Sequence, residues 1–151
     1  MMMRRLLFCI FSVCLMACGT DESGSNAAGE GSVSFYANQG FVAETGEVLS
    51  DGSGIKVDVV AYAHGDWLDL KGGREKTIYQ ALNKLNRAVF TGLDEVPCEP
   101  PTDDQISALF SLVEPGNGFT VRGNVSEGFY KVFVQDVVAN GSVTVQYARC
   151  D

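Results

Sequence analysis

The stretch Phe129–Arg149, FYKVFVQDVVANGSVTVQYAR, is the most informative part of the sequence for the fold. Two runs of alternating apolar and polar residues, 129–138 and 142–149, flank the dipeptide Asn140-Gly141. This dipeptide is the strongest short signal for a β-hairpin, because both turn positions must accept a positive φ. The two runs are therefore expected to form neighbouring antiparallel strands.

The spacing of this hairpin also predicts its buried face. With a two-residue loop, Val134 would pair with Tyr147 across the two strands. Asp136 falls on the same face, so either the register or the expected burial of that face is not settled by the sequence. The apolar side chains expected in the core are Val132, Val134, Val138, Val143, Val145 and Tyr147.

A second strand pattern occurs in the first half of the chain. In Ile55–Tyr62, IKVDVVAY, apolar side chains share one face while Lys56 and Asp58 share the other, as in a half-buried strand. A turn is expected at 64–66, and residues 67–70 are expected to return as a short strand.

The middle of the chain shows helical spacing. After a capping-box pattern at Thr77 and Gln80, apolar residues recur every three or four positions up to Phe90. A second segment of this kind begins at Thr102 and ends at Val113. Strands, two helices and more strands predict an α+β fold: one small domain, mainly antiparallel sheet, with two central helices packed on one face.

Residues 1–17 have the pattern of a secretory signal peptide. Two arginines precede an apolar run at 6–17, which is shorter than the roughly 20 residues that span a bilayer. The run ends in LMAC at 15–18, which resembles the lipobox of bacterial lipoproteins. The resemblance implies cleavage before Cys18 and lipidation of its thiol. The alternatives are an ordinary signal peptide with an unmodified Cys18, or a short uncleaved anchor.

The same resemblance implies a place in the cell. Mature lipoproteins carry two or three acyl chains, and several chains hold a protein firmly at a membrane. Gly19 rather than Asp follows the cysteine, which implies the outer membrane where the organism has one. Residues 18–32 are rich in Gly and Ser and contain no basic residue, so they predict a flexible tether. The globular domain is expected at 33–151.

The charge balance argues against two classes of partner. The chain has 11 basic and 19 acidic residues, a net charge of −8. Loss of Arg4 and Arg5 with the signal peptide leaves nine basic residues and a net charge of −10. Nucleic acids and anionic membrane surfaces would repel such a chain. No nucleic-acid partner is therefore expected, and the lipid rather than charge is expected to hold the protein at the membrane.

The predicted processing also gives the five cysteines different roles. Cys9 and Cys14 leave with the signal peptide, and Cys18 carries the lipid. The remaining pair, Cys98 and Cys150, predicts one disulfide in an exported protein. A reactive thiol or a metal-binding pair is the alternative, although neither cysteine is part of a C-x-x-C motif.

No catalytic motif is present. The sequence contains no Walker A motif, no G-x-S-x-G and no H-E-x-x-H, so no catalytic residue, cofactor or metal site is assigned. Residues 63–69, AHGDWLD, nevertheless concentrate the single histidine, the single tryptophan and two acids. The candidate ligand-binding residues are His64, Asp66, Trp67 and Asp69.

Three functions are compatible with these features. The favoured one is an envelope lipoprotein whose domain binds or scaffolds another envelope component and for which enzymatic activity is not expected. The second is a small cofactor-free hydrolase of envelope polymer built around His64, Asp66 and Asp69. The third is a glycan-binding module that requires an exposed Trp67, whereas a lone tryptophan in a small domain is more often part of the core.

Overall fold

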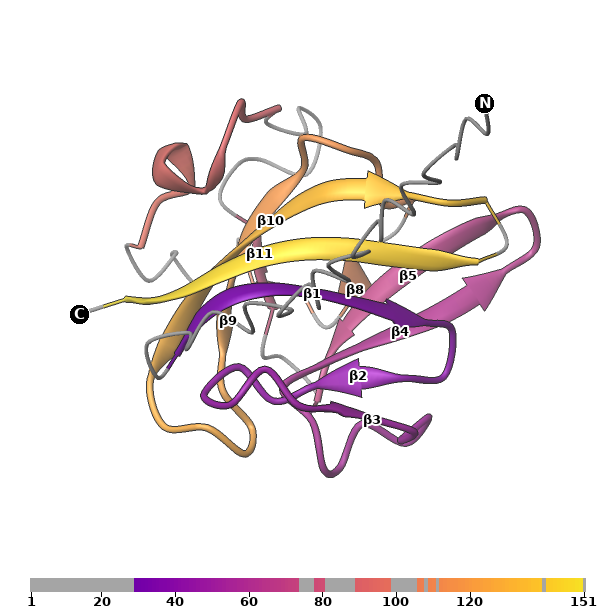
Figure 1. Ribbon diagram of the computed structural model, residues 1–151, viewed down its shortest axis with the longest axis horizontal. Coiled ribbons are helices and arrows are strands. Elements are labelled where there is room, and N and C mark those ends of the chain that lie inside the picture. Colours follow the sequence, from indigo (N-terminus) through magenta and orange to yellow (C-terminus); the bar gives the residue numbers. More distant parts are fainter. Residues whose placement is uncertain are drawn as a thin grey trace, which may run out of the picture.

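The computed structural model describes residues 29–73, 78–80, 89–98, 106–107, 109–110, 112–139 and 141–150. These residues form two antiparallel β-sheets that pack face to face (Figure 1). Within the described ranges, the larger sheet has six strands in the order β1-β11-β10-β9-β6-β7. The smaller sheet has five strands in the order β3-β2-β4-β5-β8. The fold is therefore all-β.

The strands of the larger sheet are β1 (Glu30–Tyr36), β11 (Ser142–Cys150), β10 (Phe129–Val137), β9 (Gly118–Arg122), β6 (Ile78–Gln80) and β7 (Ile106–Ser107). Those of the smaller sheet are β3 (Val48–Leu49), β2 (Gly40–Phe41), β4 (Val59–His64), β5 (Trp67–Gly72) and β8 (Leu109–Phe110). In the part of the chain that is described, the only helical element is a 3-10 turn, η1 (Leu93–Glu95).

The predicted α+β fold with two central helices is wrong. The described parts of the two segments form β6, β7 and β8 and, at 89–90 and 112–113, chain outside the named strands; the rest of both segments lies outside the described residues. β6 pairs with β9 and with β7, while β8 pairs with β5. A short apolar pattern does not distinguish a helix from a strand, and pairing with a neighbouring strand overrides local helix propensity.

The chain crosses between the sheets at both edges of the larger sheet. β7 lies at one edge, and residue 108 alone separates it from β8 at the edge of the smaller sheet. At the other edge, residues 37–39 lead from β1 to β2, and the Asn38 N–H donates to the Ala61 carbonyl at 2.7 Å. These crossings hold the two layers together along their sides.

The predicted β10–β11 hairpin forms, but its register differs from the expected one. Val134 pairs with Val145, two residues from the predicted partner Tyr147. At the turn, Val137 rather than Val138 pairs with Val143, and a β-bulge between Val134 and Asp136 shifts the register by one more residue. Asp136 is exposed, which resolves the conflict that its predicted position raised. Of the six apolar residues expected in the core, five are buried, while Val138 is 53% exposed.

The core lies between the two sheets and contains aromatic side chains from both. The ring of Phe41 on β2 lies 5.4 Å from that of Phe35 on β1 and 5.0 Å from that of Tyr147 on β11. Such tilted pairs are favourable beyond the area that they bury. Much of the remaining core is aliphatic: Val59, Ala61, Leu68, Leu70, Val121, Val132, Val134, Val143 and Val145.

A buried carboxylate connects the two layers at one end of the sandwich. The strand expected at 55–62 begins only at Val59, and Asp58 is fully buried rather than solvated. Its oxygens accept the backbone N–H groups of Ala43 and of residues 124–126, together with the hydroxyl of Ser126. Because the 123–128 loop joins β9 to β10, Asp58 holds the larger sheet against the start of β4.

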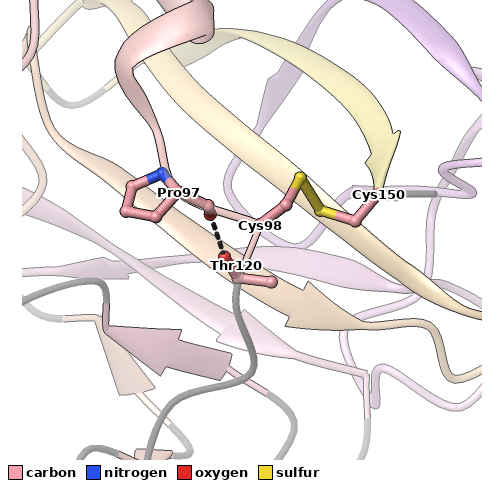
Figure 2. Close-up of a disulfide and its surroundings, with 4 residues drawn as sticks. All are labelled: Pro97, Cys98, Thr120 and Cys150. Carbon is pink, nitrogen blue, oxygen red and sulfur yellow. Dashed lines mark hydrogen bonds between the residues drawn. A yellow bond between two sulfur atoms is a disulfide. The ribbon is translucent and has the colours of Figure 1, made fainter.

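A strap of residues 89–98 packs on the outer face of the larger sheet (Figure 2). Its end is joined to β11 by a disulfide between Cys98 and Cys150, whose Cα atoms are 5.4 Å apart. The hydroxyl of Thr120 on β9 donates to the Pro97 carbonyl at 2.8 Å. These links, together with the burial of Val96, fix the strap across the sheet.

Candidate functional site: a pocket beside Trp67

The β4–β5 hairpin brings the two rarest side chains of the chain together. Its turn consists of Gly65 and Asp66, and Gly65 takes the positive φ of 62° that favours glycine at the first turn position. His64 and Trp67 are therefore directly opposite each other, and side chains in such positions lie on the same face. Their rings stack with centroids 5.1 Å apart and an angle of 12° between the planes.

Trp67 is not a core residue, contrary to the favoured expectation. It is 41% exposed, because it begins β5 at the end of the sandwich and its side chain lies on the outer face of the smaller sheet. Leu68, the next residue, points inward and is buried. The exposed indole is the condition that a binding role for Trp67 required.

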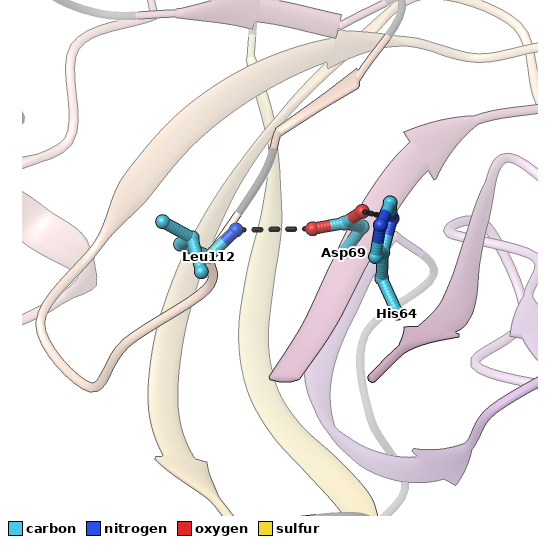
Figure 3. A network of polar contacts seen from close by, with 3 residues as sticks. All are labelled: His64, Asp69 and Leu112. Carbon is cyan, nitrogen blue, oxygen red and sulfur yellow. Dashed lines mark hydrogen bonds and ion pairs between the residues drawn. The ribbon is translucent and has the colours of Figure 1, made fainter. Parts of the chain in front are cut away.

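Asp69 is buried on this same outer face and contacts both sides of the site. Only 4% of the residue is exposed, and it lies two positions along β5 from Trp67. One carboxylate oxygen, Oδ2, is 3.5 Å from Nδ1 of His64, and the other, Oδ1, accepts the backbone N–H of Leu112 at 3.0 Å (Figure 3). Asp69 thus orients the ring that supports Trp67 and also positions the chain that faces it.

The 112–117 loop forms the opposite wall of the site. Leu112 has a positive φ of 54°, a strained conformation for a leucine, which the bond to Asp69 helps to hold. The Val113 N–H donates to the Leu68 carbonyl at 3.1 Å. Further along, the side chain of Asn117 accepts the Glu114 N–H at 2.7 Å. These bonds fix the loop at both of its ends.

Between Trp67 and this loop lies a pocket of about 280 Å³. Two acidic residues, Asp66 and Glu114, are among its lining residues, and both are exposed. Its other walls are apolar and come from β5, the 112–117 loop and the end of β10: Leu68, Leu112, Val113, Pro115, Val137 and Ala139. The pocket therefore combines an exposed aromatic ring, an apolar interior and negative charge.

A second hollow, of about 470 Å³, lies between β1, β11 and the strap. Its lining is largely polar and includes Glu30, Ser32, Asp94 and Gln146. Ser32 donates to the side chain of Gln135 at 2.8 Å, so this polar group is already paired within the sheet. The hollow has no aromatic wall and none of the predicted site residues.

The four candidate residues thus have different roles. His64, Trp67 and Asp69 form one contacting group, while Asp66 lines the pocket without a contact to the other three among the interactions of the described residues. The sequence did not indicate Leu112 and Glu114, because they lie more than 40 residues away, within and directly after a segment with helical spacing.

In the described structure, the side chain of His64 contacts Asp69 and Trp67. Among all the described residues, no group of three or more His, Cys, Asp or Glu side chains could hold a metal ion. The described part of the chain also has no helix long and apolar enough to cross a membrane.

The sequence matches no protein-family model, no curated protein and no solved structure.

Proposed function

We propose that the chain is a lipid-anchored protein of the cell envelope whose β-sandwich binds another envelope component in the pocket beside Trp67. The observation that carries this proposal is the arrangement around Asp69. One buried carboxylate positions His64 behind the exposed Trp67 and positions Leu112 across the pocket from it.

A pocket held in this way is suited to binding. Association costs free energy when side chains and loops must be ordered, and a wall that is already fixed avoids much of this cost. The exposed aromatic ring and the exposed Leu112, at 41% and 44%, offer apolar surface that a ligand can cover. Surfaces that combine a tryptophan with apolar neighbours are typical of the centres of protein interfaces.

The position of the pocket relative to the anchor supports the same proposal. The described chain enters the larger sheet at Glu30, which pairs with Ala148, and β1 ends at Tyr36, which pairs with Ser142 beside the β10–β11 turn. Ala139 at that turn lines the pocket. The entry point and the pocket are thus at opposite ends of a seven-residue strand, about 20 Å apart. A tether that ends at β1 would therefore attach to the domain at the end of this strand opposite the pocket.

Glycan binding is the second candidate function. It is favoured by the exposure of Trp67 beside Asp66, since sugars stack on aromatic rings and donate hydroxyl hydrogen bonds to carboxylates. Hydrolysis of an envelope polymer has less support, because no serine, threonine or cysteine contacts His64 among the described interactions.

Affinity capture from an envelope extract tests the proposal when the full lipidated chain is compared with two variants. Trp67→Ala removes the exposed ring of the pocket, and Ile55→Ala removes an equally accessible apolar side chain, 71% exposed, that does not line it. We expect a component that is retained by the wild type and by Ile55→Ala and lost with Trp67→Ala. A component retained equally by all three chains would contradict the pocket as the binding site.

The anchor has a separate test. Cys18→Ser should move the protein from the membrane fraction to the soluble fraction, because lipidation requires the thiol. If the variant stayed in the membrane fraction, lipidation at Cys18 would be contradicted. This experiment does not test the pocket.

A further inference from the structure

We infer that the pocket beside Trp67 accepts one lysine or arginine side chain, flanked by apolar residues, from a partner protein. This inference rests on the proposed function and specifies the chemistry of its ligand. It is argued from the charge, the hydrogen-bonding groups, the aromatic ring and the volume of the pocket.

The charge of the pocket has one sign. Asp66 and Glu114 are its charged lining residues, and none of the residues that line it is basic. The mature chain is also strongly acidic, since nine basic residues remain against 19 acidic ones once the signal peptide is removed. Such a field attracts a cationic ligand and repels an anionic one.

The hydrogen-bonding groups of the lining side chains favour a ligand that donates hydrogen bonds and does not accept them. The two carboxylates are acceptors, and the indole N–H of Trp67 is the single side-chain donor among the lining residues. Ammonium and guanidinium groups donate and do not accept, which complements this set. A sugar hydroxyl both donates and accepts, and it would find few donors here.

The aromatic ring adds a second attraction for a cation. Trp67 lines the pocket and is 41% exposed, and His64 covers one face of its indole. Lysine and arginine side chains bind favourably against indole surfaces, and their aliphatic stems pack on apolar walls such as Leu112 and Pro115.

The volume distinguishes one side chain from an oligosaccharide. Pockets for small molecules have volumes of about 300–1,000 Å³. At about 280 Å³, this pocket is below that range and has room for one long side chain rather than for several sugar rings. The apolar residues on either side of the cation would then cover the exposed parts of Trp67 and Leu112.

Trp67 is the only tryptophan in the chain, so tryptophan emission, excited selectively over that of the five tyrosines, reports on this residue alone. The probes are three blocked tripeptides, acetyl-Leu-X-Leu-amide, in which X is lysine, norleucine or glutamate, and chitotriose as a neutral glycan. Each is titrated into the full-length, detergent-solubilised protein. We expect a saturable change with the lysine peptide, at least fivefold weaker binding of the norleucine peptide, and no saturation with the glutamate peptide.

A pair of double variants separates local charge from total charge. Asp66→Asn with Glu114→Gln neutralises the pocket, and Glu30→Gln with Asp94→Asn removes the same charge from the second hollow. We expect the first pair to weaken binding of the lysine peptide about fivefold to tenfold, as loss of two partly exposed charges should. The second pair should leave the affinity within twofold of the wild type.

Three results would overturn the inference. Equal affinity for the lysine and norleucine peptides would show an apolar pocket without selection for a cation. Saturation by chitotriose without a response to the lysine peptide would identify a glycan site. In both cases the proposed binding pocket survives. If no probe changes the emission and Trp67→Ala also fails to alter capture from the envelope, the inference and the proposed function fail together.

Discussion

The buried carboxylate of Asp69 accepts the backbone N–H of Leu112 at 3.0 Å across 43 positions of sequence. This bond joins β5 to the loop that forms the far wall of the pocket. The other oxygen of Asp69 lies 3.5 Å from His64, whose ring stacks on Trp67. A single residue therefore sets the separation between the two walls.

Removal of this carboxylate should damage both stability and the pocket. Asp69→Ala removes the carboxylate that accepts the partly buried Leu112 N–H, and a hydrogen bond to a charged group contributes about 1.5–3 kcal/mol. The expected result is a loss of unfolding free energy of that size in urea, with a shifted Trp67 emission maximum in the folded state. Asp69→Asn is the matched control, because its carbonyl oxygen can still accept from Leu112. Equal stability of wild type and Asp69→Ala would contradict the role assigned to Asp69.

Asp58 should be more important for stability than Asp69. Both of its oxygens are hydrogen-bonded, it is fully buried, and it ties the 123–128 loop to the opposite sheet. Asp58→Ala would leave several buried N–H groups unpaired, and we expect a loss of about 3–5 kcal/mol or failure to fold. Asp94→Ala, at an exposed position on the strap, should change the unfolding free energy by less than about 0.5 kcal/mol. Similar effects of the two variants would refute the assignment.

Reduction of the disulfide should lower stability without changing the pocket. The bond between Cys98 and Cys150 closes a loop with a sequence separation of 52 residues. In the chain-entropy model, this closure stabilises the folded state by at most about 4 kcal/mol. Cys98→Ala with Cys150→Ala should therefore lower the midpoint of guanidinium unfolding and leave the Trp67 emission of the folded state unchanged. An intact mass under non-reducing conditions that shows two free thiols would contradict the bond.

Stability should fall in alkaline solution because of buried phenols. Burial raises the pKa of Tyr147, and the neighbouring Tyr130 raises it further; burial likewise raises the pKa of Tyr130. Above the ordinary tyrosine pKa of about 10, the folded state retains protons that the unfolded state loses. The stability that these phenols contribute is thus fully present below that pH and decreases as pH rises through the folded-state pKa values. Tyr147→Phe should reduce the slope of unfolding free energy against pH above 10, and an unchanged slope would argue against this origin.

The sequence predicted those parts of the fold that depend on local chemistry. Asn140-Gly141 located the β10–β11 hairpin. The register was wrong because the turn places Val137 rather than Val138 opposite Val143 and because a bulge follows Val134, and neither feature has a clear signal in the sequence. The helices were wrong for a different reason. The described parts of those segments pair with β9 and β5, and such long-range pairing is not visible in local periodicity.

The site, too, was predicted only where it depends on local sequence. The rare residue types at 63–69 indicated one side of it, and the hairpin turn at Gly65 brought His64 and Trp67 together. The burial of Trp67 was predicted wrongly, because its exposure depends on its place at the end of a sheet. The other side of the pocket, which includes Leu112, depends on contacts far apart in sequence and had no local signal.

Site-specific photo-crosslinking in intact cells tests the central claim most directly. A photoreactive phenylalanine analogue is placed at Ala139, which lines the pocket, and in a second chain at Ile55, which does not. We predict one discrete adduct from position 139, none of the same mass from position 55, and loss of the adduct when Trp67→Ala is combined with the probe at 139. The same adduct from both positions, or an adduct at 139 that survives Trp67→Ala, would contradict the pocket beside Trp67 as the binding site.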